Sequence, residues 1–92
     1  MKYLAILFLL AACGSNSKLS SDGRKVEIMI KPSTNCEVVG KVVGINEDGS
    51  VELARNHARN LVADEDGNAI IIDEEVANGH VFKVYATGYR CN

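Results

Sequence analysis

The sequence predicts an α+β fold: a four-stranded, largely antiparallel sheet with one helix, in the order strand, strand, helix, strand, strand. Apolar and polar residues alternate over residues 26–31, which is typical of a strand with one buried face. Apolar residues recur at helical spacing over residues 51–62. Runs rich in Val, Ile and aromatic residues precede and follow that helix, so helix and sheet are expected to form two layers.

The first two strands are expected at residues 26–31 and 37–45. In the first, alternation places Val26, Ile28 and Ile30 on the buried face. In the second, Gly40 and Gly44 interrupt a run of Val residues, and each predicts a bulge or a close approach of another backbone.

The helix is expected to begin after Ser50, because a Ser hydroxyl can accept a hydrogen bond from a free N–H of the first turn. Gly67 or Asn68 can take the left-handed conformation that ends a helix. The predicted core-facing stripe of the helix is Val51, Ala54, Ala58, Leu61 and Val62.

The third strand is expected to start with residues 69–72. The fourth strand is expected at residues 81–89. Asn78-Gly79 is typical of a tight hairpin turn. A tight turn there would place Glu75 opposite Phe82, beside apolar side chains. The sequence therefore favours a wider loop through residues 73–75.

The N-terminal residues predict export and lipidation. Residues 1–12 are apolar except for Lys2, and ten apolar residues span only about 15 Å as a helix, too short for a membrane span. This pattern is typical of a signal peptide. The following Leu10-Ala11-Ala12-Cys13 resembles the lipobox of bacterial lipoproteins, which implies cleavage before Cys13 and acylation of its thiol. The alternative is an ordinary signal peptide whose cleavage site contains a Cys.

We therefore expect three parts: a signal peptide at residues 1–12, lipidated Cys13 with a flexible tether to residue 24, and one small domain at residues 25–92. Gly14 and Ser15 lack the Asp that retains lipoproteins in the inner membrane. By that resemblance, the expected location is the bacterial cell envelope, at the periplasmic face of the outer membrane.

The chain has three cysteines, so acylation of Cys13 would leave two for a disulfide. In an exported chain, Cys36 and Cys91 are expected to form a disulfide. It would close a loop of 56 residues, which is worth about 4 kcal/mol in the chain-entropy model. Metal ligation or a redox dithiol are the alternatives, but the chain has no CxxC motif and no His near either Cys.

Several short motifs occur in order along the chain: the lipobox, the tether, Val26-Glu27-Ile28, residues 35–40, Arg59-Asn60, Gly67-Asn68 and residues 89–92. In their order and spacing they resemble the small YjeI-type bacterial lipoproteins, a family built on a domain of unknown function. More remotely, the arrangement is similar to RcsF, an outer-membrane lipoprotein that senses envelope stress. The acidic residues 64–66 and the short stretch after Gly44 depart from the family pattern, and the resemblance transfers no functional residues.

The sequence offers little chemistry for catalysis. His57 and His80 lack a local nucleophile and an orienting partner, so both are expected at the surface or in partial packing. The acidic groups at residues 64–66 and 73–75 are expected to be solvated turns, and we expect no metal and no cofactor. A net charge of −2 does not favour a nucleic-acid partner, and no small-molecule substrate is predicted.

Arg55 and Arg59 stand one helical turn apart, where like charges repel unless an anion meets them. They are therefore candidate partner-binding residues. A plain solvated face is one alternative, and bracing of the fold by Arg59-Asn60 is another.

These observations predict a non-catalytic, membrane-anchored envelope lipoprotein that acts as an interaction or structural module. The partners expected are the membrane, through the N-terminal lipid anchor, and an unidentified envelope protein. The similarity to RcsF implies a role in envelope stress. An inhibitor or immunity-type lipoprotein against a cell-wall hydrolase is the alternative. An enzyme would need His57 or His80 in a pocket with carboxylates.

Overall fold

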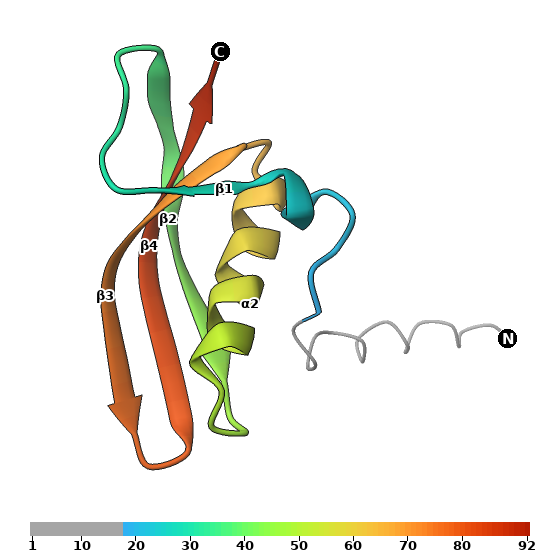
Figure 1. Cartoon of the computed structure of the whole chain (residues 1–92), viewed down its shortest axis with the longest axis vertical. Coiled ribbons are helices and arrows are strands. Elements are labelled where there is room, and N and C mark those ends of the chain that lie inside the picture. The colour runs from blue at the N-terminus through green and yellow to red at the C-terminus, as the bar shows by residue number, and fades with distance from the viewer. Residues whose placement is uncertain (1–17) are drawn as a thin grey trace, which may run out of the picture.

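Within residues 18–92, the part of the chain that the computed structural model describes, four strands form one mixed sheet and one α-helix packs against a face of it (Figure 1). This confirms the predicted α+β class, with the helix between the second and third strands. The elements are a 3₁₀ turn η1 (Gly23–Lys25), β1 (Glu27–Met29), β2 (Cys36–Asn46), α2 (Val51–Asp64), β3 (Ala69–Asn78) and β4 (Val81–Cys91).

The strand order in the sheet is β1-β3-β4-β2. β4 pairs antiparallel with both β2 and β3, whereas the short β1 pairs parallel with β3. The sheet is thus mostly antiparallel, as predicted, and its two edges are β1 and β2. The predicted signal peptide (residues 1–12) and Cys13 lie outside the described residues.

The N-terminal segment contacts α2 well before β1 begins. Asn60 on α2 accepts hydrogen bonds from the backbone N–H of Ser20 (2.9 Å) and from its hydroxyl (3.2 Å), and it donates to the carbonyl of Lys18 (2.8 Å). Gly23 is buried in the turn that follows. Composition assigns residues 13–24 to a flexible tether, but residues 18–24 pack on the helix.

β1 is less buried than its alternation predicts. Val26, directly before β1, is fully buried, but Ile28 is 47% exposed and Ile30 is 95% exposed. The prediction of a buried face is therefore wrong beyond Val26. β1 contains only three residues and pairs with β3 alone, so the sheet ends there and nothing among the described residues covers Ile30.

The two glycines of β2 have the roles that the sequence predicts. The pairing of β2 with β4 shifts between Val38 and Gly40, which is a bulge. Gly44 lies directly under α2: a Cβ there would meet the carbonyl oxygen of Ala54 and would lie 2.6 Å from the backbone nitrogen of Ala58. The helix therefore sits against the bare backbone of β2.

The core is small and consists of aliphatic side chains between α2 and the sheet. Ala54 and Ala58 let the helix approach closely, and Leu61, which the stripe also predicts as core, is only partly buried. The buried cluster contains Val26, Ala54, Ala58, Val62, Ile70, Val84 and Ala86.

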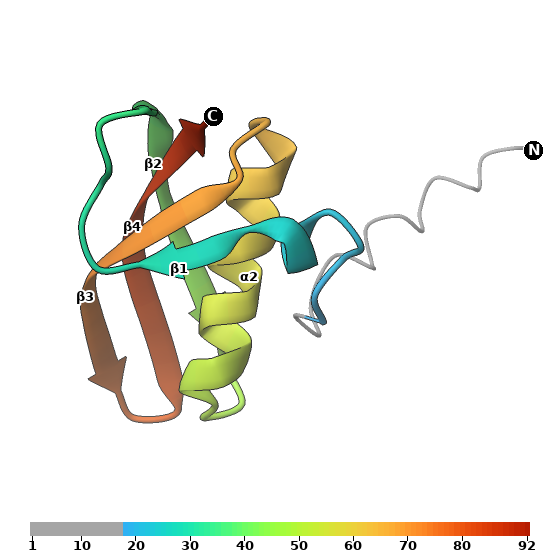
Figure 2. The same cartoon turned by 45° about the horizontal axis from the view of Figure 1, so that its top comes forward.

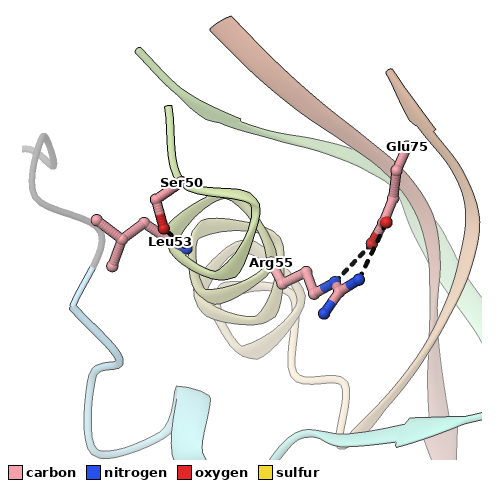
Figure 3. Close-up of polar contacts among 4 residues, drawn as sticks. All are labelled: Ser50, Leu53, Arg55 and Glu75. Atoms are coloured by element: carbon pink, nitrogen blue, oxygen red, sulfur yellow. Dashed lines mark hydrogen bonds and ion pairs between the residues drawn. The ribbon is translucent and has the colours of Figure 1, made fainter. Parts of the chain in front are cut away.

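The helix begins and ends at local signals. Ser50 Oγ accepts a hydrogen bond from the backbone N–H of Leu53 at 3.1 Å, which confirms the predicted cap (Figure 3). At the other end, Asp66 takes the left-handed conformation (φ 65°), not Gly67 or Asn68 as predicted. Gly67 is needed for space instead, because a Cβ there would lie 2.6 Å from Val62 Cγ1.

The β3–β4 hairpin is tight, so the predicted wide loop through residues 73–75 is wrong. Asn78 pairs with Val81, and Gly79 turns the chain with a φ of 66°. The two-residue turn is Gly79-His80, one position later than the predicted Asn78-Gly79, and the register that it sets places Glu75 opposite the fully buried Val84; a bulge at Asp73 follows. A carboxylate therefore does face the apolar side of the sheet, where α2 lies.

The predicted disulfide joins Cys36, the first residue of β2, to Cys91, the last residue of β4. The two residues are direct partners in the antiparallel ladder. Asn68 adds to this junction, because its side-chain amide donates to the carbonyl of Cys91 (2.9 Å) and accepts from its N–H (2.8 Å). The C-terminus is thus held by one covalent bond and two hydrogen bonds.

The close approach at Gly44 gives a test of the packing. We expect Gly44→Ala to lower the free energy of unfolding by about 3 kcal/mol, because the added methyl group meets helix backbone that cannot rotate away. Gly49→Ala is the matched control: its φ is 86° but nothing lies near its Cβ position, so a loss of about 1 kcal/mol is expected. Urea unfolding of the oxidised protein measures both, and equal losses would contradict this packing.

Candidate functional site

The most strongly paired charged groups of the domain join α2 to β3. Arg55 on α2 makes two parallel hydrogen bonds with Glu75 on β3: Nε donates to Oε2 at 2.5 Å, and Nη2 donates to Oε1 at 3.0 Å (Figure 3). Their side chains are 41% and 30% exposed, respectively. This two-point geometry explains how the tight hairpin is possible, because Arg55 neutralises the carboxylate that the register places opposite Val84.

The pair affects the acid–base behaviour of both groups. The pKa of Glu75 is lowered, chiefly because it accepts hydrogen bonds from Arg55; partial burial opposes this shift and the nearby positive charge adds to it. The pKa of Arg55 is raised, chiefly by the same hydrogen bonds. Both groups are therefore charged at neutral pH.

Arg59 and Asn60 brace the N-terminal part of the chain. Arg59 Nε donates to the carbonyl of Val26 at 3.0 Å, and its Nη2 lies 3.5 Å from the carbonyl of Arg24. Asn60 holds Ser20 and Lys18, as described above. Arg59 and Asn60 thus brace the fold by hydrogen bonds to the N-terminal part of the chain, which is one of the alternatives that the sequence left open.

The two candidate partner-binding residues therefore face different parts of the molecule. Arg55 extends to β3, and Arg59 extends to the segment before β1, so their guanidinium groups have acceptors within the chain. Binding of a partner by the two together stays a prediction. Arg55 lines a surface hollow of about 440 Å³, together with Ile28, Ile72 and residues 73–75.

A polar network crosses the sheet on the face that α2 leaves open. Lys41 Nζ on β2 donates to Thr87 Oγ1 on β4 (3.2 Å), and Thr87 donates to Asp73 Oδ2 on β3 (2.7 Å). Lys41 Nζ also lies 3.8 Å from that carboxylate oxygen. Sequence reasoning missed this network, because alternation can put Lys41 and Thr87 on one face but only the bulge at Asp73 brings the carboxylate to them.

Exposed apolar side chains adjoin this network on the same face, which we call the helix-free face. Tyr85 lies opposite Val43 in the ladder, and the next outward side chain of β2 is Ile45. These three side chains are between 37% and 38% exposed. Tyr85 lines two shallow hollows, of about 280 and 260 Å³. The helix-free face therefore combines an aromatic ring, aliphatic groups and a fixed polar cluster.

The two histidines lie on different elements. His57 Nδ1 on α2 accepts a hydrogen bond from the backbone N–H of Ile45 at 2.9 Å, so its proton is on Nε2. This bond satisfies an outward N–H of the edge strand β2. His80 is exposed in the hairpin turn after Gly79. His57 thus has a structural role at the sheet edge.

Among residues 18–92, no three His, Cys, Asp or Glu side chains gather in a way that could hold a metal ion. In the same part of the chain, no helix has the length and apolar character needed to cross a membrane.

Comparison with known protein-family models, with curated proteins and with solved structures finds no match for this chain. The resemblance to YjeI-type lipoproteins therefore stays a prediction.

The Arg55–Glu75 pair can be tested by a double-mutant cycle with Arg55→Met and Glu75→Gln. We expect a coupling energy of about 1 kcal/mol at pH 7, because the pair is only partly exposed and makes two hydrogen bonds. The pair of Lys25 and Asp22, whose side chains are 78% and 77% exposed and 3.9 Å apart, is the control, with coupling near zero.

The same cycle has an expected pH dependence. Because the folded-state pKa of Glu75 is lowered, its stabilising effect is full above the ordinary Glu pKa of 4.5 and is lost as the pH falls through the folded value. Unfolding midpoints between pH 7 and pH 3 measure this, and a coupling energy that does not fall on acidification would contradict the pairing.

Proposed function

We propose that this chain is a non-catalytic, membrane-anchored envelope lipoprotein that acts as an interaction or structural module. The observation that carries the proposal is the Cys36–Cys91 disulfide. Disulfides persist in oxidising compartments outside the cytosol. A domain closed by a disulfide agrees with the apolar residues 1–12, which are typical of an export signal.

The disulfide also separates the three cysteines by role. Cys36 and Cys91 form the disulfide and have no free thiol, so Cys13 is the cysteine that remains for acylation. It follows Leu10-Ala11-Ala12, the small-residue pattern that resembles a lipobox. Gly14 and Ser15 after it favour the periplasmic face of the outer membrane by the same resemblance.

The described domain supports an interaction or structural role through its surface. Four polar side chains of α2 bond to other parts of the chain, namely those of Arg55, His57, Arg59 and Asn60. The helix-free face, by contrast, presents Tyr85 and Val43 to solvent beside the Lys41 network. Exposed apolar side chains with a polar rim are typical of surfaces that bind another protein.

Anchoring is tested by Cys13→Ala, with Ser15→Ala as the matched control. We expect wild-type protein and Ser15→Ala in the membrane fraction, with an acylated N-terminal Cys13 by mass spectrometry. Cys13→Ala should leave that fraction, because the acyl chains supply the membrane affinity. Thiol labelling of the native protein should find no free Cys36 or Cys91. An unmodified Cys13, or membrane retention of Cys13→Ala, would overturn the anchor.

The interaction role is tested by photo-crosslinking in intact cells. A crosslinking amino acid at Tyr85 samples the helix-free face, and one at the exposed Glu52 on α2 is the control. We expect one recurring protein adduct from position 85 and not from position 52. If that protein is a cell-wall hydrolase that loses activity when bound, the inhibitor alternative holds. The same adducts from both positions, or none from position 85, would contradict the interaction role.

A further inference from the structure

Residues 18–31 run from α2 through η1 and along β1 at the edge of the sheet, and we call this segment the β1 side. It includes the segment bonded to Asn60, then η1, β1 and the two residues after β1. Figure 2 shows η1 and β1 crossing in front of α2. Because β1 and β2 are the two edges of the sheet, the β1 side lies three strand spacings, about 14 Å, from β2.

The first part of the β1 side is hydrogen-bonded to α2 and begins close in sequence to the proposed anchor. Asn60 fixes Lys18 and Ser20 to α2, and Arg59 fixes the carbonyl of Val26. Five peptide steps separate Cys13 from Lys18, and even a fully extended chain of that length reaches only about 18 Å. An acyl group on Cys13 would therefore keep Lys18, where the β1 side begins, within about 18 Å of the anchor.

The charge of the domain is divided between this side and the rest. Residues 18–31 contain four basic and two acidic residues, whereas residues 32–92 contain five basic and ten acidic residues. All six charged residues of the β1 side are exposed, and the ion pair between Lys25 and Asp22 is nearly all in solvent. A negatively charged surface would attract the β1 side and repel the remainder.

The most exposed large aliphatic side chain of the described residues also lies here. Ile30 is 95% exposed and is followed by Lys31, whose side chain has no hydrogen bond or ion pair within residues 18–92. Ile28, on the same short strand, is 47% exposed but lines the Arg55 hollow with the acidic residues 73–75, so the aliphatic contact proposed below is that of Ile30. Aliphatic groups beside basic residues suit the interface of an anionic bilayer, where the aliphatic part enters the headgroup layer and the ammonium meets phosphate.

We propose that the β1 side docks on anionic phospholipid headgroups of the membrane that holds the acyl chains, with Ile30 entering the interface and Lys31 binding phosphate. This inference rests on the proposed lipid anchor. It adds an orientation: the β1 edge faces the bilayer, and the β2 edge faces away from it.

The absence of Trp from the chain makes a direct test possible. Ile30→Trp places a single fluorescent probe on the β1 side, and Val43→Trp places one on the β2 edge as the matched control. The acylated mature protein is reconstituted in two kinds of vesicle: anionic vesicles with about 30 mol% phosphatidylglycerol, and neutral phosphatidylcholine vesicles. Each kind is prepared with and without brominated acyl chains, which quench Trp emission. We expect blue-shifted, bromine-quenched emission from the Ile30→Trp variant in anionic vesicles and weaker quenching in neutral vesicles. The Val43→Trp variant should show no quenching in either.

The charge contribution is tested in the Ile30→Trp background. Lys31→Glu and Lys83→Glu make the same change in charge, and both lysines are exposed without a hydrogen bond or ion pair within residues 18–92. Each basic residue near an anionic surface contributes about fivefold to binding. Lys31→Glu should therefore lower the ratio of docked to undocked protein at least about fivefold, whereas Lys83→Glu should leave it unchanged.

The outcomes separate this inference from the anchor on which it rests. Protein that does not float with the vesicles and carries no acyl group contradicts the anchor. Acylated protein that floats, but with the probe at position 30 unquenched or with the probes at positions 30 and 43 quenched equally, overturns the docking. A blue shift of the probe at position 30 that rises with protein density in neutral vesicles, without bromine quenching, would show that a second copy covers this position and would also overturn it.

Discussion

The position of α2 is the constraint on which the rest of the structure depends. Its small residues Ala54 and Ala58 lie on the bare backbone of Gly44, which brings the helix close to β2. At that distance its longer polar side chains reach the neighbouring segments. Arg55 bonds to Glu75 on β3, His57 to the N–H of Ile45 on β2, Arg59 to the carbonyl of Val26, and Asn60 to Ser20. One helix thus bonds to two strands, to the residue before β1 and to the N-terminal segment.

This arrangement explains why the hairpin and the helix depend on each other. The bulge at Asp73 brings its carboxylate to Thr87 on the helix-free face, and the register of the hairpin turn places Glu75 toward α2. A lone carboxylate opposite the buried Val84 would be costly, and Arg55 removes that cost with two hydrogen bonds. Acidic groups around the bulge therefore lie on both faces of the sheet, with Asp73 on the helix-free face and Glu75 on the face that α2 covers.

The parts that the sequence predicted correctly have local causes. Ser50 caps the helix through a bond to a residue three positions away, and the closeness at Gly44 follows from the missing side chain. The exposure of Ile30 and the pairing of Glu75 were not predictable in this way. Alternation shows that one face of a strand is apolar, but not whether another element covers it. The pairing of Glu75 depends on the exact register of the hairpin turn and on a helix residue twenty positions earlier in the chain.

The contact of Asn60 with the N-terminal segment also changes what a lipid anchor would do. A tether free from residue 14 to residue 24 would reach about 36 Å, which is about the length of the eleven-residue β2. The domain could then present any face to the membrane. With Lys18 and Ser20 bonded to α2, the reach falls to about 18 Å, half that length. Under the proposed anchor, a tether shorter than the domain would restrict the rotation of the domain, and the bonds of Asn60 would hold Lys18 and Ser20 nearer the bilayer than a free tether would.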